Sequence, residues 1–350
     1  YYKNQLTGMY EMPWVRVHAM TEYVDSPGIL GSTDTKVTYN LVPSFVEQLI
    51  DYANNGVLDV HTDIARRSWN SDGYPNATAL ELHTMQFQSF WNSGWIYNVS
   101  VDDSRVGWLQ PSSARYSELY DMTLHNLKPA TIMDDTLLNP QDFLDLQVLW
   151  YLYQFSPSYV QGQYNSSHRD QGLIDLFMQN GQYTLSDLTY VLDAQEIHMS
   201  NILPMYSELA ANDQVELTTT PYYHPIMPLL MMDGWTFEDG IRVNKESWPE
   251  DVTEHLETGM DLFEQELGFR PSGMWPSEQS VSPAMVQPVA DVGIEWMVTD
   301  ELNLEESTDT SGQNIDVSVA SNLATPWMVG DVATVFRDRV ISDRIAFQYD

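Results

Sequence analysis

One carboxylate stands beside a large aromatic residue at the point where an apolar segment ends. Glu278 follows Trp275 by three residues, within the stretch Gly273 to Ser282. Helix-ending residues precede this stretch, and Ser282-Pro283 supplies an N-cap followed by a proline suited to the first turn of a helix. Glu278 is therefore predicted to lie in a strand-to-helix loop, where catalytic groups collect in α/β barrels, and Trp275 can form a platform for a sugar ring.

Five other segments carry more specific patterns than this single carboxylate. They are Tyr1 to Ala19, with Leu6-Thr7-Gly8; Lys36 to Ser44; Gln214 to Pro225, with Thr220-Pro221 and His224-Pro225; Trp296 to Glu301; and Phe336 to Asp343. Together with Gly273 to Ser282, these segments resemble, in order, glycoside hydrolase family 57, and within it the amylopullulanase-like branch. Spacing alone favours an ordinary loop glutamate beside a core tryptophan, whereas the ordered resemblance favours a catalytic nucleophile.

The elements predicted from Val215 onward alternate between short apolar strands and helices, which indicates an α/β fold with a parallel sheet. The predicted strands are 37–41, 215–219, 273–275, 295–299 and 332–336, and the predicted helices beside them are 43–54, 250–267 and 283–292. The resemblance implies the family's incomplete (β/α)7 barrel, as one catalytic domain over residues 1–350, partial at both ends. Residues 58–210 are predicted to form a mainly helical insertion.

Two helices are predicted within that insertion. Asn139-Pro140 opens the first, because asparagine is a good N-cap and proline suits the first helical position. The second runs from 185 to 209 and is expected to break near Pro204.

The resemblance implies a retaining mechanism on α-glucans such as starch, glycogen, maltodextrin or pullulan, with Glu278 as the nucleophile. It also implies sugar contacts from side chains at several strand ends: Trp275, Glu216, Tyr223, His224, Asp300 and Arg337. No organic cofactor and no metal is expected in this chemistry. The linkage cleaved, α-1,4 or α-1,6, and the acceptor, water or another sugar, stay open.

Some of these residues have a structural alternative. A histidine beside proline, such as His224, fits a packed or hydrogen-bonded structural residue equally well. Arg337 can form an ion pair with Asp338 in the wall of the pocket. Of the adjacent Asp300 and Glu301 only one should line the pocket, because successive strand residues face opposite ways, and we favour Asp300.

Two parts of the family pattern have no counterpart in residues 1–350. The histidine-glutamine-proline motif of the family's first strand is expected before Tyr1, and the aspartate that acts as general acid is expected after Asp350. The sequence is therefore interpreted as a fragment that is inactive by itself. If the acid lay within it, Asp300 would be the leading candidate.

The charge balance excludes nucleic acid as a partner. The chain carries 50 acidic and 15 basic residues, a net charge of −35, and phosphate contact needs a basic surface. Only four of the basic residues are lysine. This composition favours a salt-adapted protein over a merely acidic one, because high salt screens the repulsion among carboxylates.

The sequence also bears on membrane insertion, on the compartment and on other classes of protein. No apolar run approaches the roughly 18 residues of a membrane span, and the lack of a secretion signal at the start of the chain favours the cytoplasm. A metal-dependent polysaccharide deacetylase is an alternative on a similar barrel, although the eight histidines form no His-x-x-x-His pair. A non-catalytic glucan-binding relative is a second alternative. The sequence indicates no oligomeric state.

Overall fold

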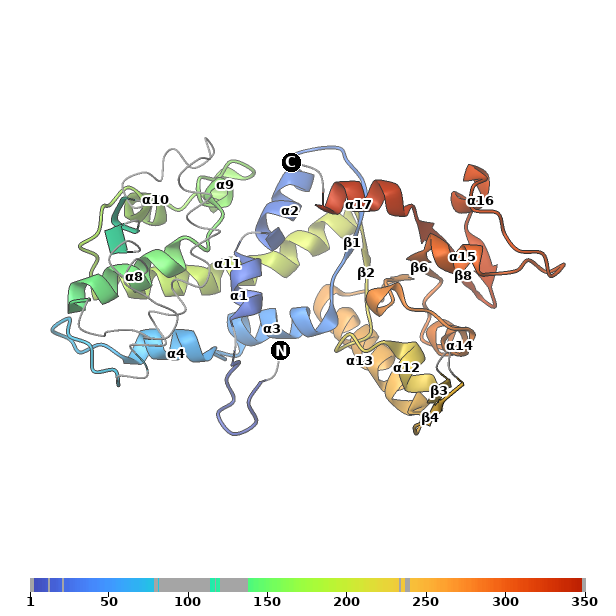
Figure 1. Ribbon diagram of the computed structural model, residues 1–350. Coiled ribbons are helices and arrows are strands. Elements are labelled where there is room, and N and C mark those ends of the chain that lie inside the picture. The colour runs from blue at the N-terminus through green and yellow to red at the C-terminus, as the bar shows by residue number, and fades with distance from the viewer. Residues whose placement is uncertain are drawn as a thin grey trace. The chain divides into compact units, whose positions relative to one another are not determined.

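The computed structural model divides the chain into two compact units (Figure 1). It describes residues 3–11, 13–20, 22–78, 81, 114–116, 118–119, 138–232, 234–236 and 240–347. The helical unit comprises Tyr1–Thr35 and Gln48–Leu209, and the sheet unit comprises Lys36–Glu47 and Ala210–Asp350. The helical unit therefore contains nearly all of the expected insertion and, in addition, the first 35 residues of the chain.

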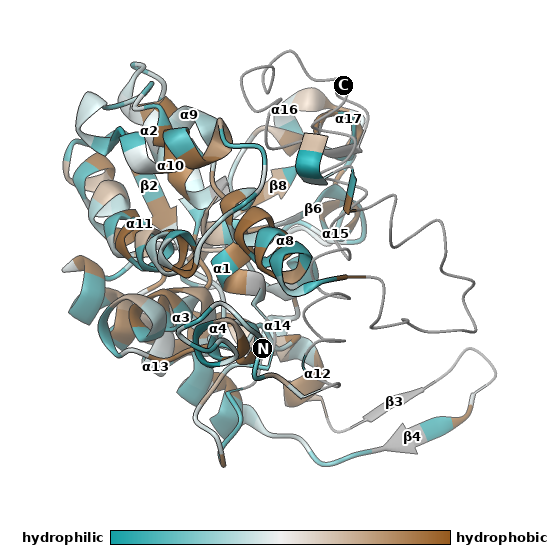
Figure 2. Cartoon of the chain, turned by 90° about the vertical axis from the view of Figure 1, so that its left-hand side faces the viewer, coloured by the Kyte–Doolittle hydropathy of each residue, from teal (hydrophilic) through white to brown (hydrophobic). Residues whose placement is uncertain are grey.

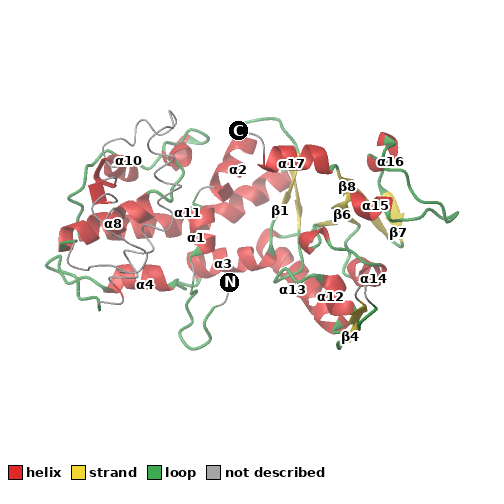
Figure 3. Cartoon of the chain, in the orientation of Figure 1, coloured by secondary structure: helices red, strands yellow, loops and turns green. Residues whose placement is uncertain are grey.

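Helices make up the regular structure of the helical unit (Figure 3). They are α1 (Trp14–Ala19), α2 (Glu22–Gly31), α4 (Val60–Arg67), α8 (Pro140–Leu152), α9 (Pro157–Val160), the 3-10 turn η2 (Ser166–His168), α10 (Gln171–Phe177) and most of α11 (Leu185–Ala211). Helix α3 (Pro43–Asn54) begins in the sheet unit and ends in the helical unit.

Helix α8 begins as the sequence predicts. Asn139 is the N-cap, and its side chain accepts hydrogen bonds from the backbone N–H groups of Gln141 and Asp142. The Asp142 side chain bonds back to the N–H of Asn139, which completes a capping box. Polar residues are mixed with apolar ones along this helix (Figure 2), and both Asp142 and Asp145 are buried.

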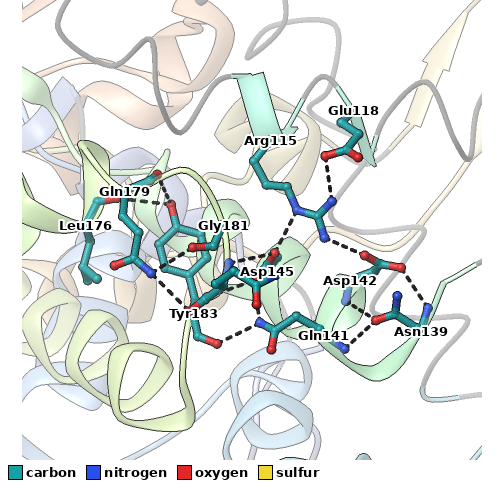
Figure 4. A network of polar contacts seen from close by, with 11 residues as sticks. Arg115, Glu118, Asn139, Gln141, Asp142, Asp145, Leu176, Gln179, Gly181 and Tyr183 are labelled. Atoms are coloured by element: carbon teal, nitrogen blue, oxygen red, sulfur yellow. Dashed lines mark hydrogen bonds and ion pairs between the residues drawn. The ribbon is translucent and has the colours of Figure 1, made fainter.

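Arg115 neutralises the buried carboxylates of α8 (Figure 4). Its Nε donates to Asp145 over 2.8 Å, and its Nη2 donates to Asp142 over 2.5 Å. Asp145 is fully buried and also accepts from the backbone N–H groups of Gln182 and Tyr183. This network fixes the turn before α11 to α8, because a buried carboxylate needs hydrogen-bond donors and two of those of Asp145 are backbone N–H groups of the turn.

A second buried ion pair joins α1 to the start of α4. Arg16 and Asp59 are both fully buried, with 2.9 Å between Nε and Oδ2. Asp59 also caps α4, since its Oδ1 accepts from the N–H of Thr62. The sequence predicted no role for Arg16, because its partner lies 43 residues away.

The predicted break in α11 is wrong. The helix runs without interruption from Leu185 to Ala211 and carries Pro204 inside it. A proline removes one N–H donor and crowds the preceding turn, but the buried residues on both sides of Pro204, Ile202 and Tyr206, continue one packed face. Tertiary packing thus outweighs the local cost of the proline.

The sheet unit contains the parallel strands. They are β1 (Val37–Asn40), β2 (Val215–Thr218), β5 (Gly273–Met274), β6 (Trp296–Asp300) and β8 (Val332–Arg337), with β7 (Trp327–Val329) antiparallel beside β8 and the separate hairpin β3 (Gly234–Thr236) and β4 (Arg242–Asn244). β1 pairs with β2, a bridge from Thr219 to Met274 joins the end of β2 to β5, and β6 and β8 follow. The described residues thus confirm the α/β class, whereas the expected incomplete (β/α)7 barrel is not confirmed among them.

Helices cover this sheet as the alternating pattern predicts. They are α12 (Met227–Met231), α13 (Pro249–Leu267), α14 (Pro283–Asp291), α15 (Glu301–Glu305), α16 (Ala320–Leu323) and α17 (Arg339–Phe347). The core is rich in methionine: Met274 and Met297 of the strands pack with Met260 of α13 and Met285 of α14. Gly268 ends α13 in the left-handed conformation at φ 83°, the usual C-terminal role of glycine.

Candidate active site

The sheet unit brings several loops to one edge of the sheet. In parallel strands the carboxyl ends all lie on the same side, so the segments that follow β2, β5, β6 and β8 share that edge (Figure 1). These segments contain Tyr223 and His224, Trp275 and Glu278, Asp300, and the residues after Arg337. This is the edge at which binding sites form in α/β proteins.

Glu278 lies on a tight turn directly after β5. The turn is the 3-10 segment η3 (Ser277–Gln279), closed by bonds from the N–H of Gln279 to the Pro276 carbonyl, 2.8 Å, and from the N–H of Ser280 to the Ser277 carbonyl, 3.0 Å. Glu278 and Gln279 both have left-handed φ angles, 54° and 55°. Such a conformation costs a residue with a side chain about 1–3 kcal/mol and is typical of functional sites.

The strained turn presents the Glu278 carboxylate to solvent. Its side chain is 73% exposed. A nucleophile needs this accessibility, and a glutamate with a purely structural role would be expected to bond its oxygens to neighbouring donors instead. The predicted position of Glu278, in a loop between a strand and a helix, is confirmed.

His224 approaches Glu278 from the loop after β2. Its Nε2 lies 3.6 Å from Oε1 of Glu278, and its side chain is 39% exposed. His224 is also left-handed, with φ 58°, in a turn closed by its N–H and the carbonyl of Pro221 over 2.8 Å. Two separately strained turns therefore bring an imidazole and a carboxylate together.

The aromatic candidates flank these two residues along the chain. Trp275 is half-buried. Its backbone N–H donates to the Thr219 carbonyl over 2.8 Å, which ties the turn of Glu278 to the end of β2. Tyr223 is 62% exposed. Partial burial raises the pKa of Tyr223, and so does the Glu47 carboxylate, which is negatively charged and accepts a hydrogen bond from the Tyr223 hydroxyl.

The contact from Glu47 was not foreseen from the sequence. Glu47 belongs to α3 and lies far from Tyr223 along the chain. The helical pattern of α3 carries no signal of a contact with the loop after β2.

Asp300 is the last residue of β6 at this edge, and both of its carboxylate oxygens accept hydrogen bonds. Oδ2 accepts from Nε of Arg337 over 3.2 Å and lies 3.7 Å from Nε of Arg339, while Oδ1 accepts from the N–H of Leu302 and caps α15. Arg337 also pairs with Asp343 over 3.2 Å. The ion pairs of Arg337 are thus with Asp300 and Asp343, and the expected partner Asp338 instead caps the first turn of α17 through the N–H of Ile341.

Glu216 is the candidate that the fold does not bring to this edge. It is paired with Thr38 near the start of β2, and it accepts hydrogen bonds from Nε1 of Trp296, 2.9 Å, and Oγ of Ser272. Trp296 is the first residue of β6 and Asp300 the last, a separation of about 13 Å at 3.3 Å per residue. Glu216 therefore lies at the amino-terminal end of the strands.

Among the residues that the structure describes, no three His, Asp or Glu side chains stand close enough to form a metal-binding group. None of the helices in those same stretches combines the length and apolar character that a bilayer crossing requires.

The described residues thus place an exposed carboxylate on a strained turn at the carboxyl edge of the parallel strands, which makes this edge the candidate active site. The family model of glycosyl hydrolase family 57 matches residues 1–350. The chain therefore belongs to glycosyl hydrolase family 57. No curated protein matches the chain.

Solved structures of several enzymes are similar to the chain at low identity. An α-amylase from Thermotoga maritima matches 95% of the chain at 12% identity, with a TM-score of 0.45. A branching enzyme from Thermococcus kodakaraensis also matches 95%, at 13% identity and a TM-score of 0.42, and a 4-α-glucanotransferase from Thermococcus litoralis matches 45%, at 18% identity and a TM-score of 0.33. The chain spans 42%, 44% and 22% of these three proteins, respectively.

Proposed function

We propose that the protein is a retaining α-glucan-active glycosidase or transglycosylase in which Glu278 is the nucleophile. Membership of glycosyl hydrolase family 57 supports the reaction class. The observation that carries the residue assignment is the turn of Glu278, which has two consecutive left-handed residues and an exposed carboxylate at the carboxyl end of β5.

In this mechanism the Glu278 carboxylate attacks the anomeric carbon of the sugar. The bond from that carbon to the leaving oxygen breaks, and a protonated carboxyl group gives the leaving oxygen its proton. The glycosyl-enzyme ester is then opened by water or by a sugar hydroxyl, whose proton returns to the same acid. Trp275 and Tyr223 are proposed to stack against sugar rings, and His224 to hold a sugar hydroxyl or the Glu278 carboxylate.

Asp300 is better suited to building the site than to acting as the acid. A general acid needs a protonated oxygen that is free to reach the leaving group. Both oxygens of Asp300 accept hydrogen bonds, one from Arg337 and one from the start of α15. We therefore propose that Asp300 and Arg337 together form the wall of the substrate pocket, and we do not include Glu216 in it.

Replacement of Glu278 in the full-length protein tests the assignment. Glu278→Gln should lower kcat on an α-glucan by at least about a thousandfold, as the loss of a central catalytic group does. Glu278→Ala should regain activity on an α-maltosyl fluoride when azide is added, and the product should be the glycosyl azide of inverted configuration. Azide then forms the new bond to the anomeric carbon as fluoride leaves.

Glu216→Gln is the matched control, because it removes a carboxylate from the same unit at the other end of the strands. It should leave kcat within about threefold of the unsubstituted protein, since no transition-state contact is lost. Activity of Glu278→Gln within tenfold of the unsubstituted protein would rule Glu278 out as the nucleophile.

We also propose that the surface is adapted to high salt, on the basis of the net charge of −35. At 1 M salt the screening length falls to about 3 Å, which relieves repulsion among exposed carboxylates. The thermal midpoint should therefore rise by several degrees between dilute buffer and molar potassium chloride. A flat or falling midpoint in a calorimetric series would contradict salt adaptation.

A further inference from the structure

A buried threonine of the neighbouring strand holds the turn that carries Glu278. Thr299 of β6 is 1% exposed. Its Oγ1 donates to the backbone carbonyl of Gln279 over 2.7 Å. The bond crosses from one strand end to the loop after another, so it ties the turn to the sheet at the residue directly after Glu278.

Asn303 of α15 fixes the direction of this hydrogen bond. Its Nδ2 donates to Oγ1 of Thr299 over 2.6 Å. An amide nitrogen can only donate, so the threonine oxygen is the acceptor of this bond, and its own proton is directed to the Gln279 carbonyl. Bonds in such a chain polarise and strengthen one another.

The strain in the turn explains why it needs an anchor from outside. Glu278 and Gln279 both occupy the left-handed region, and the hydrogen bonds of Gln279 N–H and Ser280 N–H close the turn without fixing it to the sheet. A strained conformation persists only where its surroundings determine it. The Thr299 hydroxyl supplies such a constraint to the carbonyl that lies between the two strained residues and the next helix.

Asp300 and Arg337 complete the support behind Asn303. Asp300 caps α15 through the N–H of Leu302, so it sets the position of the helix on which Asn303 stands. Arg337 of β8 holds the other oxygen of Asp300. A continuous set of polar contacts therefore runs from β8 through α15 to the turn after β5.

We propose that Thr299 and Asn303 are positioning residues that hold the Glu278 carboxylate in the orientation needed for attack. The inference rests on the proposed function of Glu278 as nucleophile. Without the hydroxyl, the turn can relax from its left-handed geometry and the carboxylate moves away from the anomeric carbon. A displacement of about 1 Å costs roughly a hundredfold in rate, while contacts with the rest of the substrate stay in place.

Thr299→Val in the full-length protein tests this proposal, because valine keeps the shape and removes the hydroxyl. We expect kcat to fall about 10- to 100-fold while KM changes less than about threefold, since the loss affects orientation rather than binding. Thr299→Ser should restore most of the rate because it keeps the donor. Asn303→Ala should lower kcat in the same sense, and the double variant should be no slower than Thr299→Val alone.

Thr334→Val provides a matched control. Thr334 lies on β8 beside β6, is 2% exposed, and its Oγ1 has no hydrogen-bond partner among the described residues. Its replacement removes a buried hydroxyl of the same sheet without touching the turn, so kcat should stay within about twofold. An equal loss of kcat in Thr334→Val and Thr299→Val would show a general packing effect and overturn the proposal.

Glu278→Gln is measured beside these variants to separate the two proposals. If it is inactive and Thr299→Val keeps kcat within twofold, the positioning role is wrong and the nucleophile stands. If Glu278→Gln stays active, the nucleophile assignment fails and the positioning role fails with it. A Thr299→Val protein too unstable to assay leaves Asn303→Ala, on half-buried Asn303, to decide by the same split between kcat and KM.

Discussion

Two turns of this molecule share an unusual backbone and use it in opposite ways. In the helical unit, Gly181 and Gln182 are left-handed, at φ 77° and 59°, and the buried carboxylate of Asp145 holds that turn by its N–H groups. In the sheet unit, Glu278 and Gln279 are left-handed, and the carboxylate belongs to the turn itself and faces solvent. The first carboxylate stabilises its turn, whereas the second stays exposed, as the proposed nucleophile must be.

The difference shows where each turn gets its rigidity. Asp145 accepts hydrogen bonds from Arg115, Gln141 and two backbone N–H groups. The turn at Gly181 and Gln182 is therefore fixed by a buried negative charge. The Glu278 carboxylate makes no such bonds in the described residues, and its turn is held by neutral groups, the backbone N–H of Trp275 before it and the hydroxyl of Thr299 at Gln279. A neutral anchor can hold a nucleophile without drawing on the charge that it needs for attack.

Asp145→Ala should have the largest effect on the free energy of unfolding. It leaves the N–H groups of Gln182 and Tyr183 without their buried acceptor, and it removes from Arg115 one carboxylate partner, while Asp142 and Glu118 remain. Breaking one side of a buried ion pair typically costs about 3–5 kcal/mol. The free energy of unfolding, measured in urea, should fall by that amount.

Asp193→Ala is the exposed counterpart in the same unit. Asp193 pairs with Arg66 over 2.9 Å and its side chain is 54% exposed. Surface pairs contribute about 0–1 kcal/mol, so this change should be nearly neutral. Equal losses of unfolding free energy in the two variants would mean that burial of Asp145 does not strengthen its contribution to stability.

Acid should weaken the helical unit through a buried histidine, His198. Burial lowers the pKa of His198 to about 4, below its usual value near 6.5. The folded state therefore keeps His198 neutral between these pH values while the unfolded chain binds a proton, and stability is lost as pH falls from 6.5 to 4. One such group contributes a slope of about 1.4 kcal/mol per pH unit.

The pH dependence of His198→Phe isolates this contribution. His198 packs against the rings of Phe155 and Tyr159, so phenylalanine keeps the aromatic contacts and removes the titrating group. The fall in unfolding free energy between pH 6.5 and 4 should be shallower in the variant. Parallel curves for both proteins would show that His198 titrates alike in the folded and unfolded states.

Gln279→Gly and Gln182→Gly form a matched pair with the smallest expected effect on stability. Glycine adopts left-handed angles without strain, so each substitution should raise the free energy of unfolding by up to about 1 kcal/mol. Only Gln279→Gly should also lower kcat, because a freer turn positions Glu278 less well. A rate loss in both variants, or in neither, would remove the functional distinction between the two turns.

Local signals in the sequence were sufficient to place the turn of Glu278. Gly268, which ends α13, and the Ser282-Pro283 start of α14 mark both sides of the segment that contains it. The same kind of signal predicted the Asn139 cap of α8. Such helix start and stop signals can be recognised because they depend only on residues that are close together in the sequence.

The contacts that the sequence does not reveal are set by strand register. Asp300 lies opposite Arg337 because β6 and β8 pair in that register, whereas the sequence offered the neighbour Asp338. Glu216 was expected near the sugar, yet its place at the start of β2 gives it Trp296 as its partner. Likewise, the sequence carries no signal for Thr299, because threonine is common in buried strands. Only its hydrogen bond to the Gln279 carbonyl distinguishes it.

The register between β6 and β8 has a consequence for how the chain can vary in length. Trp296 to Asp300 pair one to one with Ala333 to Arg337, so a single residue inserted into either strand would separate Asp300 from Arg337. An insertion in β6 would also turn Thr299 away from the turn of Glu278. The connection between the strands, residues 306–326, carries no such constraint, since its hydrogen bonds lie largely within its own turns. Insertions and deletions should therefore gather in that connection, while the two strands keep their lengths.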